Sequence, residues 1–227
     1  MATPCVSIWT RIALIAVCAA LADLVSHQPA AAQMGVMCRP VAERTREQGC
    51  WIIGQQNIGR LSHRTAYWRI DSYPSRTEAE ANKTPRSAIL ESFGKVWLLT
   101  IDERRRSSGR AHVAEIGPLP IEPGDFAVQY MEAVFDPGMT TITHRHSGPE
   151  AWYTLQGEMC LETPAGKQLG RAGGPPVIVE GGAPMHLTAV GTEQRRALVL
   201  ILHRAGEPPT TPTRDWTPKG LCKLSDR

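Results

Sequence analysis

Hydrophobic and polar residues alternate along short stretches of the chain, which is typical of strands with one buried face. In the segment 126–135 one predicted face carries Phe126, Val128, Tyr130, Glu132 and Val134, and the other carries Ala127, Gln129, Met131 and Ala133. Similar stretches, separated by Gly and Pro, occur at 50–53, 66–70, 96–101, 158–162, 177–179 and 196–203. Short strands spaced by roughly 8–12 residues predict an all-β sandwich or barrel.

The segment 33–120 is predicted to be a β-rich N-terminal extension with one short helix. Residues 54–59 carry turn chemistry between two expected strands. Ser75 and Glu78 have the spacing of a capping box, which predicts a short helix ending near Asn82. Pro and Gly near position 120 predict a connector into a barrel at 121–205, followed by a Pro-rich tail at 206–227.

Residues 1–32 have the features of a secretory signal peptide. Arg11 precedes a mostly apolar run, and Ala30, Ala31 and Ala32 supply small residues before Gln33. The apolar run, about 14 residues, is short for a membrane span. We expect cleavage near Ala32 and a periplasmic or secreted protein without a stable membrane span; an uncleaved anchor is the alternative.

Charge adds little to this picture. Without the leader the chain keeps 24 basic residues (25 minus Arg11) and 21 acidic residues (22 minus Asp23), a net charge of +3. The most compact basic cluster, 104–106, directly follows Asp102 and Glu103, which favours a solvated loop. We therefore expect no nucleic-acid partner.

Four cysteines remain after the leader, an even number for an exported protein, which favours disulfides. Cys38 and Cys50 would close a short local loop, and Cys160 with Cys222 would join the tail to the barrel. Pairing of Cys38 or Cys50 with Cys222 stays open at this stage. No Cys-x-x-Cys pair suggests a zinc site.

The candidate chemistry lies between Gly138 and Gly157. His144 and His146 are two residues apart, so on a strand both imidazoles point to the same face. A turn follows, and a second strand that begins near Glu150 would bring its carboxylate beside them. Two imidazoles and a carboxylate suit one divalent transition metal, Fe, Mn, Ni, Zn or Cu. The alternative is a packed or surface pair without metal.

This segment resembles the first signature motif of the cupin superfamily: Gly, five residues, His-x-His, three residues, Glu, six residues and Gly. The resemblance implies an antiparallel double-stranded β-helix (jelly-roll) barrel with the metal inside. It also implies a second motif with one more histidine; the counterpart is 181–186, where Gly181 and Ala183 replace the family's Pro and Gly. By resemblance the metal ligands are then His144, His146, Glu150 and His186. The predicted pocket walls are Tyr130, Ile142 and Trp152.

The resemblance implies an exported metal-binding cupin. We expect a metal-dependent enzyme with dioxygenase-like or decarboxylase-like chemistry on a small organic molecule, because such a ligand set leaves open metal positions. Glu132 and Tyr130 are candidate acid–base groups. The alternative is a non-catalytic module that binds a small molecule or metal. Cupin barrels often pair, so a homodimer is also expected. Residues 33–120 are either a degenerate cupin unit or a structural elaboration.

Overall fold

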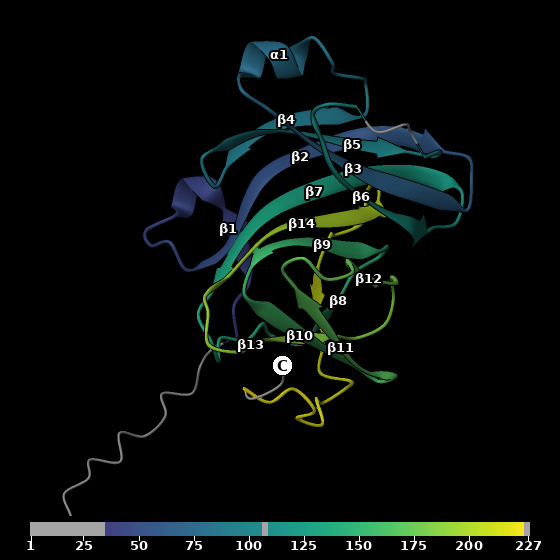
Figure 1. The fold of residues 1–227 in the computed structure, drawn as a ribbon. Helices are drawn as coiled ribbons and strands as arrows, with labels where there is room; N and C mark the ends of the chain where they lie inside the picture. The colour runs from purple at the N-terminus through teal and green to yellow at the C-terminus, as the bar shows by residue number, and fades with distance from the viewer. Residues whose placement is uncertain (1–34, 106–108, 225–227) are drawn as a thin grey trace, which may run out of the picture. The chain divides into compact units, whose positions relative to one another are not determined.

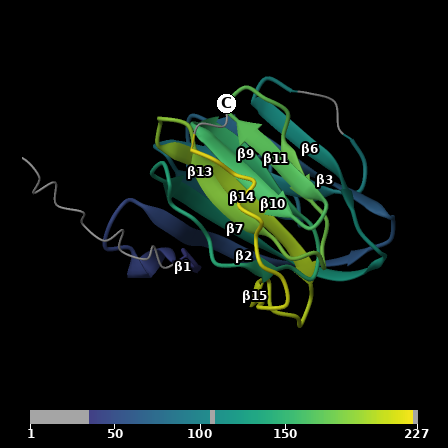
Figure 2. The ribbon, with the colours of Figure 1, turned by 90° about the horizontal axis from the view of Figure 1, so that it is seen from below.

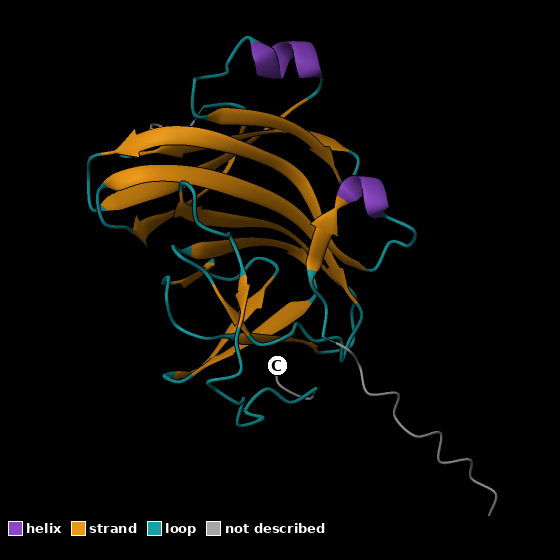
Figure 3. Ribbon diagram, turned by 180° about the vertical axis from the view of Figure 1, so that it is seen from behind, coloured by secondary structure: helices purple, strands orange, loops and turns teal. Residues whose placement is uncertain are grey.

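The structure is a computed structural model that describes residues 35–105 and 109–224, all within the compact unit Met34–Arg227. The predicted leader, residues 1–32, lies outside the described residues. Strands dominate this part of the chain, as the all-β prediction requires (Figure 3). Within it, no helix has the length and apolarity needed to cross a membrane.

The largest sheet has six strands in the order β1-β2-β7-β14-β9-β12 (Figure 1). Its strands are β1 (Cys38–Pro40), β2 (Gly49–Leu61), β7 (Gly124–Phe135), β9 (Glu150–Gln156), β12 (Val177–Val179) and β14 (Arg195–Arg204). They pair antiparallel except β1, which pairs parallel with β2. The turn predicted at 54–59 is wrong, because β2 passes through Gly54 and Gly59 as register irregularities without reversing.

A four-stranded sheet covers one face of the six-stranded sheet (Figure 1). Its order is β4-β5-β3-β6, and its strands are β3 (Thr65–Tyr73), β4 (Ser87–Ser92), β5 (Lys95–Asp102) and β6 (His112–Pro120). The alternation predicted for 126–135 holds: Phe126, Val128 and Tyr130 pack into the core of this side, with Trp68 and Trp97 of the four-stranded sheet. The described strands before β7 thus contribute β1 and β2 to the main sheet and β3–β6 to the sheet that covers it.

The opposite face of the six-stranded sheet meets two smaller sheets (Figure 2). One has the order β11-β10-β13, formed by β10 (Glu158–Thr163), β11 (Gly166–Arg171) and β13 (His186–Val190); the other pairs β8 (His144–Arg145) with β15 (Thr211–Pro212). Met131, Ala133 and Phe135 of β7 share the core between these layers with Leu161 and Leu187. The six-stranded sheet and the two smaller sheets therefore enclose a second core, and the described strands form four separate sheets, not one continuous hydrogen-bonded barrel.

Two cross-links and a capped helix complete the fold. The disulfides are Cys38–Cys50 and Cys160–Cys222, so the local and the tail pairing are both confirmed. The Ser75 half of the predicted capping box is confirmed: Ser75 Oγ accepts from the backbone N–H of Glu78 and caps α1 (Arg76–Glu80), while the Glu78 carboxylate accepts from Ser75 Oγ. One 3-10 turn, η1 (Val41–Glu43), follows β1.

Candidate metal centre

His144 begins the short strand β8, His146 directly follows that strand, and both side chains are buried. Their ring centroids lie 4.9 Å apart. The Pro-rich tail fixes this strand, because β15 pairs with it and places Pro212 opposite His144. The same-face placement expected from the His-x-His spacing therefore holds, although the strand is much shorter than the motif suggested.

Glu150 is the first residue of β9 and reaches the two histidines from the six-stranded sheet. One ligand atom from each of His144, His146 and Glu150 lies within 4.8 Å of the other two. Trp152 Nε1 donates a hydrogen bond of 2.7 Å to Glu150 Oε1. That bond leaves Oε2, 3.1 Å from His146 Nε2, as the carboxylate oxygen directed at the cluster.

Backbone carbonyls orient both imidazoles. His144 Nδ1 lies 2.8 Å from the carbonyl oxygen of Ile142, and His146 Nδ1 lies 2.6 Å from that of Pro209. Since a carbonyl oxygen can only accept, Nδ1 of each ring is the donor, which leaves Nε2 as the possible ligand atom. A hydrogen-bonded Nδ1 with a free Nε2 is the usual arrangement of a metal-binding histidine.

The pKa shifts favour the metal-binding forms of these groups. Burial, helped by the charge of His146, lowers the pKa of His144. Burial acts to raise the pKa of Glu150, but hydrogen bonding and charge from His146, His144 and Trp152 outweigh it, so its pKa lies below the usual value. Near neutral pH, Glu150 is thus an anion and His144 is neutral, as metal ligation requires.

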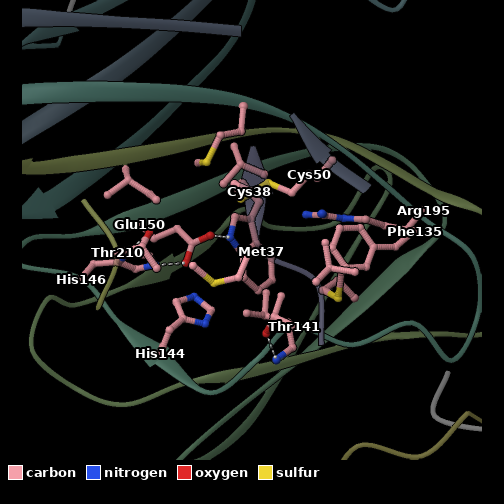
Figure 4. Close-up of a pocket in the computed structure, with 18 residues that line it drawn as sticks. Met37, Cys38, Cys50, Phe135, Thr141, His144, His146, Glu150, Arg195 and Thr210 are labelled. Carbon is pink, nitrogen blue, oxygen red and sulfur yellow. Dashed lines mark hydrogen bonds and ion pairs between the residues drawn. A yellow bond between two sulfur atoms is a disulfide. The ribbon is translucent and has the colours of Figure 1, made fainter. Parts of the chain in front are cut away.

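The cluster faces a small cavity between the six-stranded sheet and the smaller sheets (Figure 4). The space open to the centre of a water molecule is about 40 Å³. Most of the lining is apolar or sulfur-containing and includes Met131, Phe135, Val199, Ile201 and the Cys38–Cys50 disulfide. Met37, 38% exposed, is the most exposed of the lining residues.

The structure does not bring His186 to the other three predicted ligands. His186 starts β13 opposite Glu162 of β10, and burial lowers its pKa while Glu162 acts to raise it. The next residue, Leu187, lines the cavity, so strand alternation directs His186 to the other face of the sheet. It is the fully buried Met185 that pairs with His144.

Of the three predicted walls, the structure places Trp152 in the cavity lining. Tyr130 lies in the other core, 6.4 Å from Trp68 between ring centroids, because its position on β7 directs it to the four-stranded sheet. Ile142 is half-buried and meets the site through its carbonyl oxygen. Glu132, a candidate base, accepts hydrogen bonds from Arg44 and Ser92 on the Tyr130 side of β7.

Sequence reasoning missed the contributions from both ends of the described chain and from β14. Val36, Met37 and Cys38 form one wall, and Thr210 of the tail forms another. Nothing local in these segments signals a site, since the sheet pairing brings them there. Arg195 also lines the cavity; as a charged residue before an apolar run, it is easily mistaken for the solvated start of a strand.

No family model and no curated protein matches the chain. Three similar solved structures are a cupin-like protein from Thermotoga maritima (16% identity, 40% of this chain, 77% of that chain, TM-score 0.34), a cupin family protein with a double-stranded β-helix fold from Methanocaldococcus jannaschii (19%, 32%, 67%, 0.30) and the DMSP lyase DddQ from Ruegeria pomeroyi (22%, 39%, 42%, 0.30). The chain spans less than half of that lyase. At these scores the similarities carry no information on activity.

The architecture itself defines the class. Two facing β-sheets enclose a core, and the segment from Gly138 to Gly157 places two histidines and a glutamate at one end of it. These are the features of a cupin fold, as the motif predicted. A fold of this kind is compatible with many activities, so the function has to be argued from the site.

Proposed function

We propose that this protein is a metal-dependent cupin in which His144, His146 and Glu150 hold one divalent transition metal. The observation that carries the proposal is the state of His146: Nδ1 faces the Pro209 carbonyl, and Nε2 faces the Glu150 carboxylate. Two acceptors satisfy one imidazole only if it is doubly protonated or if a cation lies between Nε2 and Oε2. Three donors converging in a buried site fit a metal of the Fe, Mn, Ni, Zn or Cu group.

We further propose an enzyme of dioxygenase-like or decarboxylase-like type that acts on a small organic molecule. A metal bound by three protein groups would supply Lewis-acid or redox chemistry at its open positions. The protein's part is to keep His144 neutral through burial, to keep Glu150 ionised through His146, His144 and Trp152, and to exclude water with apolar walls. The small cavity limits the substrate to a few non-hydrogen atoms.

One observation favours the second candidate, a non-catalytic binding module. Among the described residues that line the cavity, the titratable groups are the three candidate ligands and Arg195, apart from the disulfide cysteines. An arginine is a poor general acid or base because its pKa is high. A reaction that needs a separate proton donor or acceptor therefore has none in this wall.

Turnover after metal reconstitution separates the two candidates. The protein is loaded in turn with Fe(II), Mn, Ni, Zn and Cu and supplied with small carboxylic and phenolic acids, while oxygen uptake and CO₂ release are followed. The enzyme proposal expects turnover with at least one metal and its loss in Glu150→Ala. Stoichiometric metal without turnover of any compound would contradict the enzyme and support the binding module.

We also propose that the chain is exported with cleavage near Ala32. Two disulfides support an oxidising compartment, where such bonds persist. Mass spectrometry of the protein recovered from the periplasm or medium tests the proposal. The expected N-terminus is Gln33; recovery of the full chain from membranes would support the uncleaved anchor instead. A homodimer remains a prediction for solution scattering.

A further inference from the structure

Arg195 lies in the cavity across from the candidate metal ligands (Figure 4). Its side chain is almost fully buried, with an exposed fraction of 2% for the residue. The guanidinium stacks over the Trp152 ring, 5.4 Å from the centroid, and two of its nitrogens, Nε and Nη2, are buried without a hydrogen-bond partner. We propose that Arg195 is the carboxylate-binding residue of this pocket and that the ligand is a small carboxylate.

Burial of this charge without a partner is unfavourable. Burial lowers the pKa of Arg195 to about 10, with Glu150 acting in the opposite direction, so the guanidinium is still protonated at neutral pH. A buried cation is normally paired with an anion and fully hydrogen-bonded, because its lost hydration has to be replaced. Arg195 lacks this replacement at two of its nitrogens, and a bound anion would supply it.

Three other arginines of the protein form ion pairs with carboxylates, as charged groups in proteins usually do. Arg44 pairs with Glu132 at 2.7 Å, Arg69 pairs with Asp71 at 2.7 Å, and Arg196 pairs with Glu47. Arg196 is the immediate neighbour of Arg195 on β14 but faces the opposite side of the sheet. These three partly exposed arginines each have a carboxylate partner, whereas two nitrogens of the almost fully buried Arg195 have no hydrogen-bond partner.

The identity of the two unpartnered nitrogens points to a carboxylate. Nε–H and one N–H of Nη2 lie along a single edge of the guanidinium and point in the same direction, which matches the two oxygens of a carboxylate. A neutral ligand of the same shape would not replace the lost hydration of a cation. The geometry therefore favours a planar, singly charged ligand over a neutral one.

The cavity sets the size of this carboxylate. Its free space, about 40 Å³ for water-sized centres, is room for roughly three water molecules. Formate, acetate and glycolate are of this size, and the apolar walls around Phe135 and Val199 suit a short carbon chain. With the carboxylate at Arg195, the other end of the ligand would face His144 and Glu150, so the inference names the substrate class of the proposed function and rests on it.

The last glycine of the histidine motif, Gly157, packs directly against the backbone of Arg195. Gly157, the last residue of the motif, has φ +68°, and a Cβ at this position would lie 2.8 Å from the Cα of Arg195. A side chain there would push β14 away from the site. The closing glycine of the histidine motif is therefore also what lets Arg195 approach the cavity.

Calorimetric titration with acetate tests the inference, with acetamide as the neutral isostere and inorganic phosphate as the other anion. The wild type, Arg195→Met, Arg195→Lys and Arg196→Met are compared in metal-free and metal-loaded form. We expect acetate to bind the wild type and Arg196→Met alike. Binding should weaken about 10- to 100-fold in Arg195→Met. It should weaken less in Arg195→Lys, because lysine keeps the positive charge but lacks the two parallel N–H donors of the guanidinium edge.

Three outcomes would overturn the inference: equal acetate binding by wild type and folded Arg195→Met and Arg195→Lys, equal binding of acetamide and acetate, or tighter binding of phosphate than of acetate. Metal content separates this inference from the proposed function. If the wild type holds no metal but its acetate binding depends on Arg195, the metal proposal alone is wrong. If the wild type holds one metal ion per chain but its acetate binding does not depend on Arg195, the carboxylate inference alone is wrong.

Discussion

Replacing Arg195 with methionine should stabilise the protein when no ligand is bound. The guanidinium is buried, and two of its nitrogens have no hydrogen-bond partner. Methionine is unbranched, of comparable length and apolar, and its thioether adapts to irregular cavities. Most substitutions of a buried residue destabilise a protein, so an increase in the free energy of unfolding is a distinctive expectation.

The size of the gain follows from the pKa. Burial lowers the pKa of Arg195 from 12.5 to about 10, which corresponds to about 3 kcal/mol against the charged form in the folded state. The lost stacking of the guanidinium on Trp152 offsets about 1 kcal/mol. We therefore expect Arg195→Met to raise the free energy of unfolding by about 2 kcal/mol, within the usual range for replacing buried charges by apolar groups.

Urea denaturation of the metal-free protein, in a buffer without carboxylates, measures this change. The matched control is Arg196→Met, because Arg196 is partly exposed and pairs with Glu47 on the other face of the sheet. Its loss should change stability by no more than about 0.5 kcal/mol. A decrease of 1 kcal/mol or more in Arg195→Met would refute the reasoning, since it would mean that the guanidinium is already satisfied within the protein.

Three further predictions follow from the site. Trp152→Phe removes the hydrogen bond that orients Glu150, and metal affinity measured by chelator competition should fall about 10- to 100-fold; unchanged affinity would contradict that role. Tyr130→Phe should leave metal content unchanged, because Tyr130 packs in the other core; loss of metal would contradict this placement. Burial lowers the pKa of His144 and His186. As the pH falls through about 6.5, these histidines therefore bind protons in the unfolded chain before they do so in the folded protein, which lowers the free energy of unfolding. The urea concentration at the midpoint of unfolding of the metal-free protein should decrease over this pH range.

The fold was predictable where local patterns decide it. Period-two alternation assigned the two faces of 126–135 correctly, and the capping box at Ser75 located α1. The turn predicted at 54–59 was wrong, because glycine occurs both in turns and at register irregularities of a long strand, as at Gly54 and Gly59 of β2. Sheet order was beyond local patterns as well, since β2 joins β7 across more than sixty residues.

The site shows the same division. The spacing of His144, His146 and Glu150 was enough to predict their convergence, because strand alternation and one turn control it. The prediction for His186 depended on which face of β13 it occupies; its neighbour Leu187 lines the cavity, so His186 lies on the other face. Arg195 could not be found from sequence, because its significance lies in the partners that its nitrogens lack.

Metal content tests the central claim most directly. Elemental analysis of the mature protein, purified without a histidine tag, is compared with that of His144→Ala and Glu150→Ala, and circular dichroism verifies that both variants are folded. The account predicts close to one metal ion per wild-type chain and its loss in both variants. A wild type that holds no metal, even after reconstitution with Fe(II), Mn, Ni, Zn and Cu, would contradict it.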